Sequence, residues 1–121
     1  MSRQHTILVA DDDDMVRLVM RTLLKHQGYQ VEEAVNGLEA LEKCRENPAG
    51  IDLVMMDLNM PTLGGLEALN ELQRLYPDIK AVLLSGGADD PVGRGETVRF
   101  LQKPFEYKEL FRLVGEMLPP A

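Results

Sequence analysis

Three aspartates of this sequence stand where they could bind a divalent cation together. Asp11 and Asp12 directly follow the apolar run 7–10, and Asp57 directly follows the largely apolar segment 51–56. Two carboxylates about 5 Å apart repel each other by roughly 3 kcal/mol at an effective dielectric constant of 20, so three that converge need a cation or a proton. Oxygen ligands alone select Mg²⁺, Mn²⁺ or Ca²⁺ over Zn²⁺, and a small set completed by water suits Mg²⁺ best. We therefore expect Mg²⁺ here, with Mn²⁺ as an acceptable substitute.

The next two aspartates have a simpler interpretation. Asp13 and Asp14 continue the acidic run into a segment of helical period. Aspartate is favoured at a helix N-terminus, because its carboxylate accepts backbone N–H groups and offsets the helix dipole. We interpret these two residues as part of a helix N-terminus rather than as metal ligands.

A second set of side chains predicts phosphoryl chemistry. A carboxylate beside a metal ion can attack phosphorus and form an aspartyl phosphate, provided that the oxygens of the transferred group are neutralised. Asp57 would attack, the metal would bind one phosphoryl oxygen, and Lys103 and the Ser85 hydroxyl would bind the other two. Gly86 and Gly87 follow Ser85 and leave room for the phosphoryl group and for free backbone N–H donors.

The elements that must position these side chains can be predicted from apolar patterning. Short segments rich in apolar residues predict five strands, at 7–10, 31–35, 51–56, 79–84 and 98–101, of which 31–35 has a weaker pattern. Helical spacing of apolar residues predicts helices over 16–24, 38–44, 66–76 and 107–118. Alternating strands and helices with short connections form a parallel sheet covered on both faces, a doubly wound α/β fold. In the flavodoxin-like strand order 2-1-3-4-5 the first and third strands are neighbours, which brings Asp11, Asp12 and Asp57 to one crevice.

One connection departs from this regular alternation. Residues 85–97 must cross from the fourth strand to the fifth, and they include four glycines and Pro91. Glycine costs about 1 kcal/mol in a helix interior and proline costs more. We therefore predict a shortened or irregular fourth helix.

Composition excludes several classes of protein. The length of 121 residues indicates one domain, and the formal net charge of −7 disfavours direct binding to nucleic acid. No apolar run approaches the roughly 20 residues of a membrane helix, and no secretory signal precedes Ile7. Cys44 is the single cysteine, so no internal disulfide can form. We expect one cytoplasmic domain over 1–121, with its core at 6–118, no membrane insertion and no visible output domain.

Five dispersed motifs resemble the receiver domain of response regulators, the chemotaxis-regulator-like module of two-component signalling. They are Ile-Leu-Val-Ala-Asp-Asp-Asp at 7–13, Asp-Leu-Val-Met-Met-Asp-Leu-Asn-Met-Pro at 52–61, Gly65, Leu-Leu-Ser-Gly at 83–86 and Phe-Leu-Gln-Lys-Pro-Phe at 100–105. The resemblance implies that Asp57 accepts a phosphoryl group from a phosphohistidine of a sensor histidine kinase or a histidine phosphotransfer protein. It implies a signalling domain rather than an enzyme, with slow self-dephosphorylation only.

The resemblance also implies a ligand set for the metal. In the family, the residues at the positions of Asp12 and Asp57 bind Mg²⁺ directly. The backbone carbonyl at the position of Asn59 completes the protein ligands, and Asp11 contributes through water.

Further roles follow from the same resemblance. Ser85 matches the switch hydroxyl of the family and Lys103 matches its phosphate-binding lysine, and the Lys103–Pro104 bond is expected to be cis. Phe100 stands where the family has an aromatic that moves inward on phosphorylation, although a plain core aromatic would also fit there.

The sequence departs from the family pattern at two places. Gly64 replaces a frequent aspartate. The short 86–97 segment alters the face formed by the fourth helix, fifth strand and fifth helix, so we expect a monomer or a weak dimer.

Two alternative functions are compatible with the sequence. One alternative is a phosphorylation-independent, receiver-like interaction module. The other is a small phosphatase with an aspartyl intermediate. The downstream protein partner is not predicted.

Overall fold

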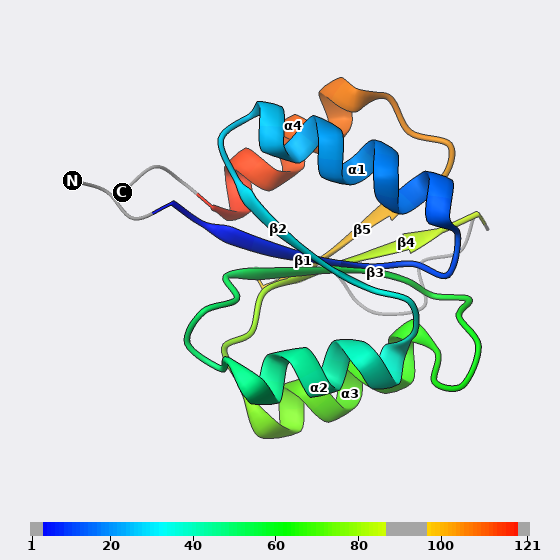
Figure 1. The fold of residues 1–121 in the computed structure, drawn as a ribbon, viewed down its shortest axis with the longest axis vertical. Coiled ribbons are helices and arrows are strands. Elements are labelled where there is room, and N and C mark those ends of the chain that lie inside the picture. Colours follow the sequence, from blue (N-terminus) through cyan, green and yellow to red (C-terminus); the bar gives the residue numbers. More distant parts are fainter. Residues whose placement is uncertain (1–3, 87–96, 119–121) are drawn as a thin grey trace.

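The five strands form one parallel sheet in the order β2-β1-β3-β4-β5, shown in Figure 1. The structure is a computed structural model, and it describes residues 4–86 and 97–118. The strands are β1 (Thr6–Ala10), β2 (Gln30–Ala34), β3 (Leu53–Asp57), β4 (Ala81–Ser85) and β5 (Val98–Gln102). The predicted doubly wound, flavodoxin-like fold is confirmed. All residues of the three inner strands are buried, as expected for a parallel sheet that is covered on both faces.

Helices cover both faces of this sheet. They are α1 (Asp14–His26), α2 (Gly37–Glu46), α3 (Gly65–Leu75) and α4 (Tyr107–Met117). In Figure 1, α1 and α4 lie on one face and α2 and α3 lie on the other. The carboxylate of Asp13 caps α1 by accepting the N–H groups of Met15 and Val16, so its predicted capping role is confirmed. Because Asp13 is the N-cap, α1 begins at the next residue, Asp14.

The alternation of side chains along each strand divides the core into two clusters. Ile7 and Val9 of β1 pack with residues of α1 and α4, whereas Leu8 and Ala10 pack with residues of α2 and α3. Successive side chains of a strand point to opposite faces, so one buried strand serves both clusters. The two clusters hold β1 in the middle of the molecule, and they thereby fix the position at which Asp11 leaves the sheet.

Two strands begin later than the apolar pattern predicts. β3 begins at Leu53 instead of residue 51, and β4 begins at Ala81 instead of residue 79. Ile79 donates its N–H to the carbonyl of Tyr76, which closes the turn after α3, and Ile51 directly follows a turn in which Gly50 bonds to Asn47. Apolar side chains in these turns cover the edge of the core, which is why they resemble strand residues in the sequence.

Other sequence-based expectations concern the crossover and the membrane. The predicted shortening or irregularity of a fourth helix falls on residues 87–96, which lie outside the described part of the chain. Within residues 4–86 and 97–118, no helix is long and apolar enough to cross a bilayer.

Candidate functional site

The sheet order brings the three predicted aspartates together. β1 pairs with β3, and Ala10 lies opposite Met56, so the residues that follow them leave neighbouring strands at the same edge. One carboxylate oxygen from each of Asp11, Asp12 and Asp57 lies within 4.8 Å of the others. Asp11 is completely buried and Asp57 is nearly so, whereas Asp12 is exposed. The cluster is therefore a negative pocket with one open side.

Lys103 is the cation inside this pocket. Its Nζ lies 2.9 Å from Asp11 Oδ2 and 3.3 Å from Asp57 Oδ2. Burial by itself lowers the pKa of Lys103, but the hydrogen bonds and charges of Asp11 and then of Asp57 outweigh it and raise the pKa above its ordinary value. Lys103 is therefore an ammonium ion at neutral pH, and it bridges two carboxylates that come from different strands.

Backbone N–H groups hold the other oxygens of the two buried carboxylates. Asp13 donates its N–H to Asp11 Oδ1 at 2.9 Å, and Asn59 donates its N–H to Asp57 Oδ1 at 3.2 Å. Each carboxylate thus has one oxygen bound by Lys103 and one bound by the loop that follows its strand. Hydrogen bonds to charged groups are stronger than those between neutral groups, so both side chains are well oriented. Asn59 itself is exposed, and its backbone lies beside the carboxylate of Asp57.

Ser85 and Lys103 occupy the same edge of the sheet. Ser85 ends β4 and is buried, and Lys103 donates its backbone N–H to the Ser85 carbonyl at 2.6 Å. The Lys103–Pro104 peptide bond is cis. Phe100 lies on β5 opposite Leu83, half-buried against the α2 and α3 cluster. Its predicted inward movement stays a prediction.

A glycine allows the loop after Asp57 to close tightly over β3. A Cβ atom on Gly65 would lie 2.3 Å from the Asp57 carbonyl oxygen, which no side chain can tolerate without a backbone shift. Gly65 also begins α3 and donates its N–H to the carbonyl of Leu58. The first residue of α3 therefore lies against the backbone of Asp57, the candidate phosphoacceptor, and of Leu58.

Arg17 is the residue at this site that the sequence interpretation missed. Its Nη1 donates to the backbone carbonyl of Asp11 at 2.6 Å, although the residue stands on α1. The signal in the sequence was a single cation one turn after four consecutive aspartates, close to a helix N-terminus that disfavours positive charge.

Comparison with known proteins agrees with this geometry. The protein-family model of the response regulator receiver domain matches residues 7–115. The chain belongs to this family. Receiver domains are signalling modules of two-component systems rather than turnover enzymes, and they bind Mg²⁺ at an aspartate cluster.

Relatives of the receiver domain occur both as short chains and within long ones. The domain is 30% identical to chemotaxis protein CheY of Bacillus subtilis, over 94% of this chain and 98% of CheY. It is 39% identical to sensor kinase CckA of Brucella abortus, over 98% of this chain but only 13% of the kinase. The domain superposes on response regulator TrrA of Thermotoga maritima, solved in complex with Mg²⁺ and BeF, with a TM-score of 0.85 at 31% identity. The superposition covers 95% of this chain and 100% of TrrA.

An apolar groove adjoins the aspartate cluster of the receiver domain. It has a volume of about 600 Å³, and it runs between the exposed side of α1 and the loop after β5. Met15, Val19 and Phe105 line it together with Lys103 itself. Met15 is 63% exposed and Val19 is 48% exposed, so apolar surface lies next to the bridging lysine.

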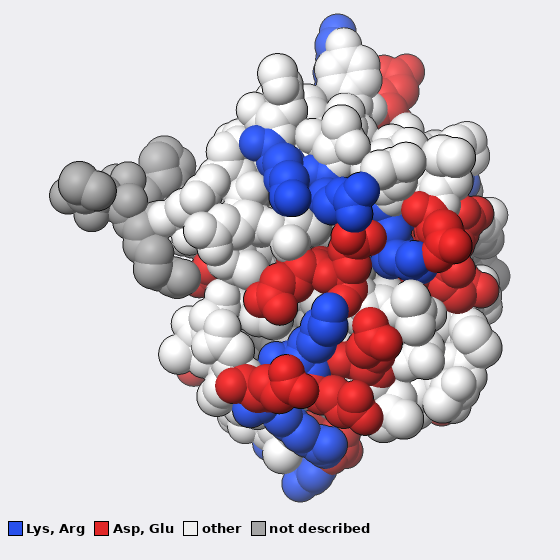
Figure 2. Space-filling model, in the orientation of Figure 1, with Lys and Arg blue, Asp and Glu red and all other residues white. Residues whose placement is uncertain are grey.

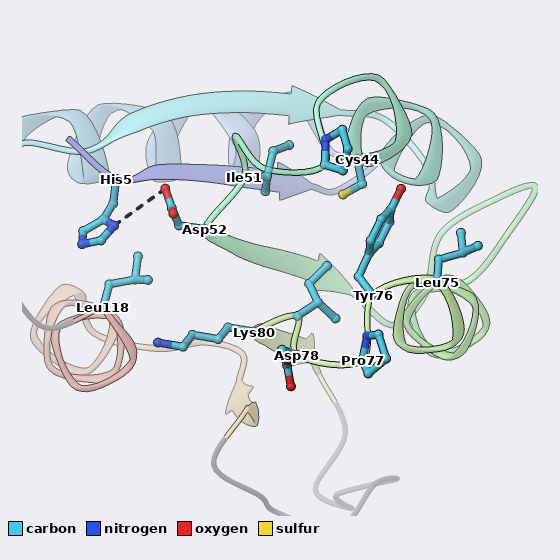
Figure 3. A pocket seen from close by; sticks show the side chains of 12 residues that line it. His5, Cys44, Ile51, Asp52, Leu75, Tyr76, Pro77, Asp78, Lys80 and Leu118 are labelled. Atoms are coloured by element: carbon cyan, nitrogen blue, oxygen red, sulfur yellow. Dashed lines mark ion pairs between the residues drawn. The ribbon is translucent and has the colours of Figure 1, made fainter. Parts of the chain in front are cut away.

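A second cavity, of about 490 Å³, lies at the opposite edge of the sheet (Figure 3). Asp52 accepts the N–H of Thr6 and lies 3.7 Å from His5, whose two ring nitrogens make no hydrogen bond within the described part of the chain, and Lys80 donates to the Met117 carbonyl. None of the residues that line this cavity belongs to the aspartate cluster.

Proposed function

We propose that this receiver domain accepts a phosphoryl group from a phosphohistidine of a histidine kinase or a histidine phosphotransfer protein onto Asp57. The observation that carries the proposal is the Asp57 carboxylate, which lies within reach of two other carboxylates and of the Lys103 ammonium. In the transfer step, an oxygen of Asp57 forms a bond to phosphorus while the bond from phosphorus to the histidine nitrogen breaks. The electron pair of that bond stays with the imidazole.

The charge of the transferred group explains the other residues. A phosphoryl group adds about −1.5 to −2 charges and three acceptor oxygens to a pocket that is already acidic. Lys103 would move from the carboxylates to one phosphoryl oxygen, and the Ser85 hydroxyl would donate to another. These contacts replace those of the unphosphorylated state, which is how phosphorylation would change the ends of β4 and β5, the loop after β5 and the partner that they bind.

Asp12 and Asp57 would bind Mg²⁺ directly, with the backbone carbonyl of Asn59 as the third protein ligand and Asp11 bound through water. When bound, Mg²⁺ neutralises a phosphoryl oxygen and the charge of the cluster. The proximity of three carboxylate oxygens supports this assignment, as does the complex of TrrA with Mg²⁺ and BeF. Mn²⁺ has the same ligand preference and would substitute.

The decisive experiment is phosphorylation by acetyl phosphate in the presence and absence of Mg²⁺. We expect the mass of one phosphoryl group to be added to most of the protein with Mg²⁺ present. With excess EDTA, labelling should fall at least about 100-fold, because the developing charge is no longer neutralised. Intact-mass spectrometry measures both. Absence of labelling together with absence of Mg²⁺ binding would favour the phosphorylation-independent interaction module.

The apolar groove beside Lys103 supports a protein as the phosphodonor. A small phosphodonor needs only the cluster, whereas a kinase domain must cover the surface around it. We expect Val19→Asp to slow transfer from an autophosphorylated histidine kinase at least about tenfold, because a charge would be desolvated at the interface. Labelling by acetyl phosphate should stay unchanged. Transfer from a panel of purified radiolabelled kinases measures the first rate.

Leu18→Asp is the matched control for the groove. Leu18 stands on the same helix and is 40% exposed, but it does not line the groove. Equal slowing by the two substitutions would contradict a specific role of the groove.

We further propose that residues 1–121 form a single receiver domain that acts in the cytoplasm as a monomer or weak dimer, without direct nucleic-acid binding. The chain covers 13% of CckA and 26% of transcriptional regulatory protein ZraR of Klebsiella oxytoca, so receivers of this kind also occur inside longer proteins. We expect hydrolysis of its own aspartyl phosphate to be slow, as the resemblance to receiver domains implies.

A further inference from the structure

Arg17 makes contacts that its place on α1 does not require. A cation in the first turns of a helix is opposed by the helix dipole. The Arg17 side chain is nevertheless only 11% exposed, and its guanidinium is held by the carboxylates of Asp14 and Glu33. Burial lowers the pKa of Arg17, and the two carboxylates together raise it, so the group is always charged.

The contact that matters for the site is with the backbone of Asp11. The Asp11 carbonyl lies one residue past the end of β1, and Arg17 Nη1 donates to it at 2.6 Å. Asp11 is completely buried, and a buried carbonyl without a donor is costly. Arg17 therefore supplies the partner that the strand no longer provides at this position.

Holding this carbonyl also determines where Asp12 begins. The carbonyl of Asp11 and the N–H of Asp12 belong to one planar peptide group, so fixing the first fixes the second and the Cα of Asp12. The Asp11 side chain is fixed separately, by Lys103 and by the N–H of Asp13. Arg17 thus orients the peptide between two of the three clustered aspartates.

Glu33 on β2 anchors the guanidinium from the other side. Its carboxylate lies 3.4 Å from Arg17 Nε and 2.6 Å from Arg21 Nη1, and its backbone carbonyl accepts a hydrogen bond from Lys43. On the face shown in Figure 2, acidic and basic side chains lie next to one another. A rigid strand residue therefore fixes Arg17, and Arg17 fixes the turn.

We propose that Arg17 is a positioning residue of the metal site, which orders the turn carrying Asp11 and Asp12 before the ion binds. The inference deepens the proposed function and rests on it for the identity of the site. Arginine suits this role because its planar fork donates in several fixed directions, which an ammonium group does not.

The test uses Mn²⁺ as the probe, with free Mn²⁺ measured by electron paramagnetic resonance. We expect Arg17→Gln to weaken Mn²⁺ binding about 10- to 100-fold, as the loss of groups that orient metal ligands does. Arg17→Lys should weaken it at least about fivefold, because it keeps the charge and loses the fork. Arg21→Gln removes a cation from the same helix and the same glutamate without touching Asp11, and should change binding less than about threefold.

A second readout needs no metal. In EDTA, the amide hydrogen of Asp13, which bonds to Asp11, should exchange at least about tenfold faster in Arg17→Gln than in Arg21→Gln, since the turn opens locally. If Arg17→Gln does not fold, Arg17→Lys and Glu33→Gln provide the same comparison.

Several outcomes would overturn the inference. These are Mn²⁺ binding by Arg17→Gln within about twofold of the unsubstituted chain, an equal loss in Arg21→Gln, or unchanged exchange at Asp13. If the unsubstituted chain binds Mn²⁺ but is never labelled on Asp57, the proposed function fails while the role of Arg17 at the metal site stands. If the unsubstituted chain is labelled normally on Asp57 and Arg17→Gln binds Mn²⁺ as well as the unsubstituted chain does, only the inference about Arg17 fails.

Discussion

Asp57→Asn should abolish phosphorylation by acetyl phosphate, with a fall of at least about 1,000-fold in the rate at which phosphoryl mass is added. An amide nitrogen or oxygen is a far weaker nucleophile than a carboxylate, and the substitution leaves the size of the side chain unchanged. The fold should persist, because the amide oxygen can still accept the N–H of Asn59. Intact-mass spectrometry gives the rate, and circular dichroism gives the fold.

Asp78→Asn is the matched control for this substitution. Asp78 is exposed and lines the cavity at the opposite edge of the sheet, so its substitution makes the same chemical change away from the cluster. Its labelling rate should equal that of the unsubstituted chain. Continued labelling of Asp57→Asn at the normal rate would show that another residue is the acceptor.

Lys103→Met should slow labelling about 100- to 1,000-fold, the usual effect of removing one group that stabilises transition-state charge. It should also destabilise the metal-free protein by about 1–3 kcal/mol, less than for a fully buried pair because the lysine is 25% exposed. The buried Asp11 carboxylate would lose its cation. Because folding raises the pKa of Lys103, this contribution is complete at neutral pH and is lost only as pH rises above 10.5 through the folded-state pKa.

Two further variants separate these effects. Lys108→Met removes an exposed lysine of α4 and should change neither rate nor stability. Adding Asp11→Asn to Lys103→Met should restore part of the lost stability, since one of the two buried carboxylates that lost the ammonium is then neutral, without restoring the labelling rate. Urea denaturation in EDTA measures the stabilities. A normal labelling rate for Lys103→Met would refute the role of this lysine.

The elements of the fold were largely predictable because their signals are local. A run of apolar residues such as 7–10 favours a buried strand wherever it pairs, and helical spacing does the same for α4. Asp13 was recognised as a cap for the same reason, since the aspartate and the N–H groups that it accepts are neighbours in the chain. The starts of β3 and β4 were wrong by two residues, because apolar side chains in a turn and in a strand cover the core alike.

Contacts between distant residues were not predictable in detail. The sequence pattern predicted that Asp11, Asp57 and Lys103 lie at one edge of the sheet, but it did not predict that one ammonium group pairs with both carboxylates. That pairing joins residues 92 and 46 positions apart. The contact of Arg17 with the Asp11 carbonyl was missed, since the sequence shows the cation near the aspartates but not which backbone atom accepts its hydrogen bond.

Apolar periodicity is a property of short segments, so the residue types are enough to predict a parallel sheet with three aspartates, a serine and a lysine at the ends of its strands. Only the folded chain shows that Asp11 is buried while its neighbour Asp12 is exposed, and that Arg17 holds the peptide between them. Burial of adjacent residues depends on the turn that the chain takes at the end of β1. That turn is set by contacts with β2, α1 and the loop after β5, which meet only in the folded protein.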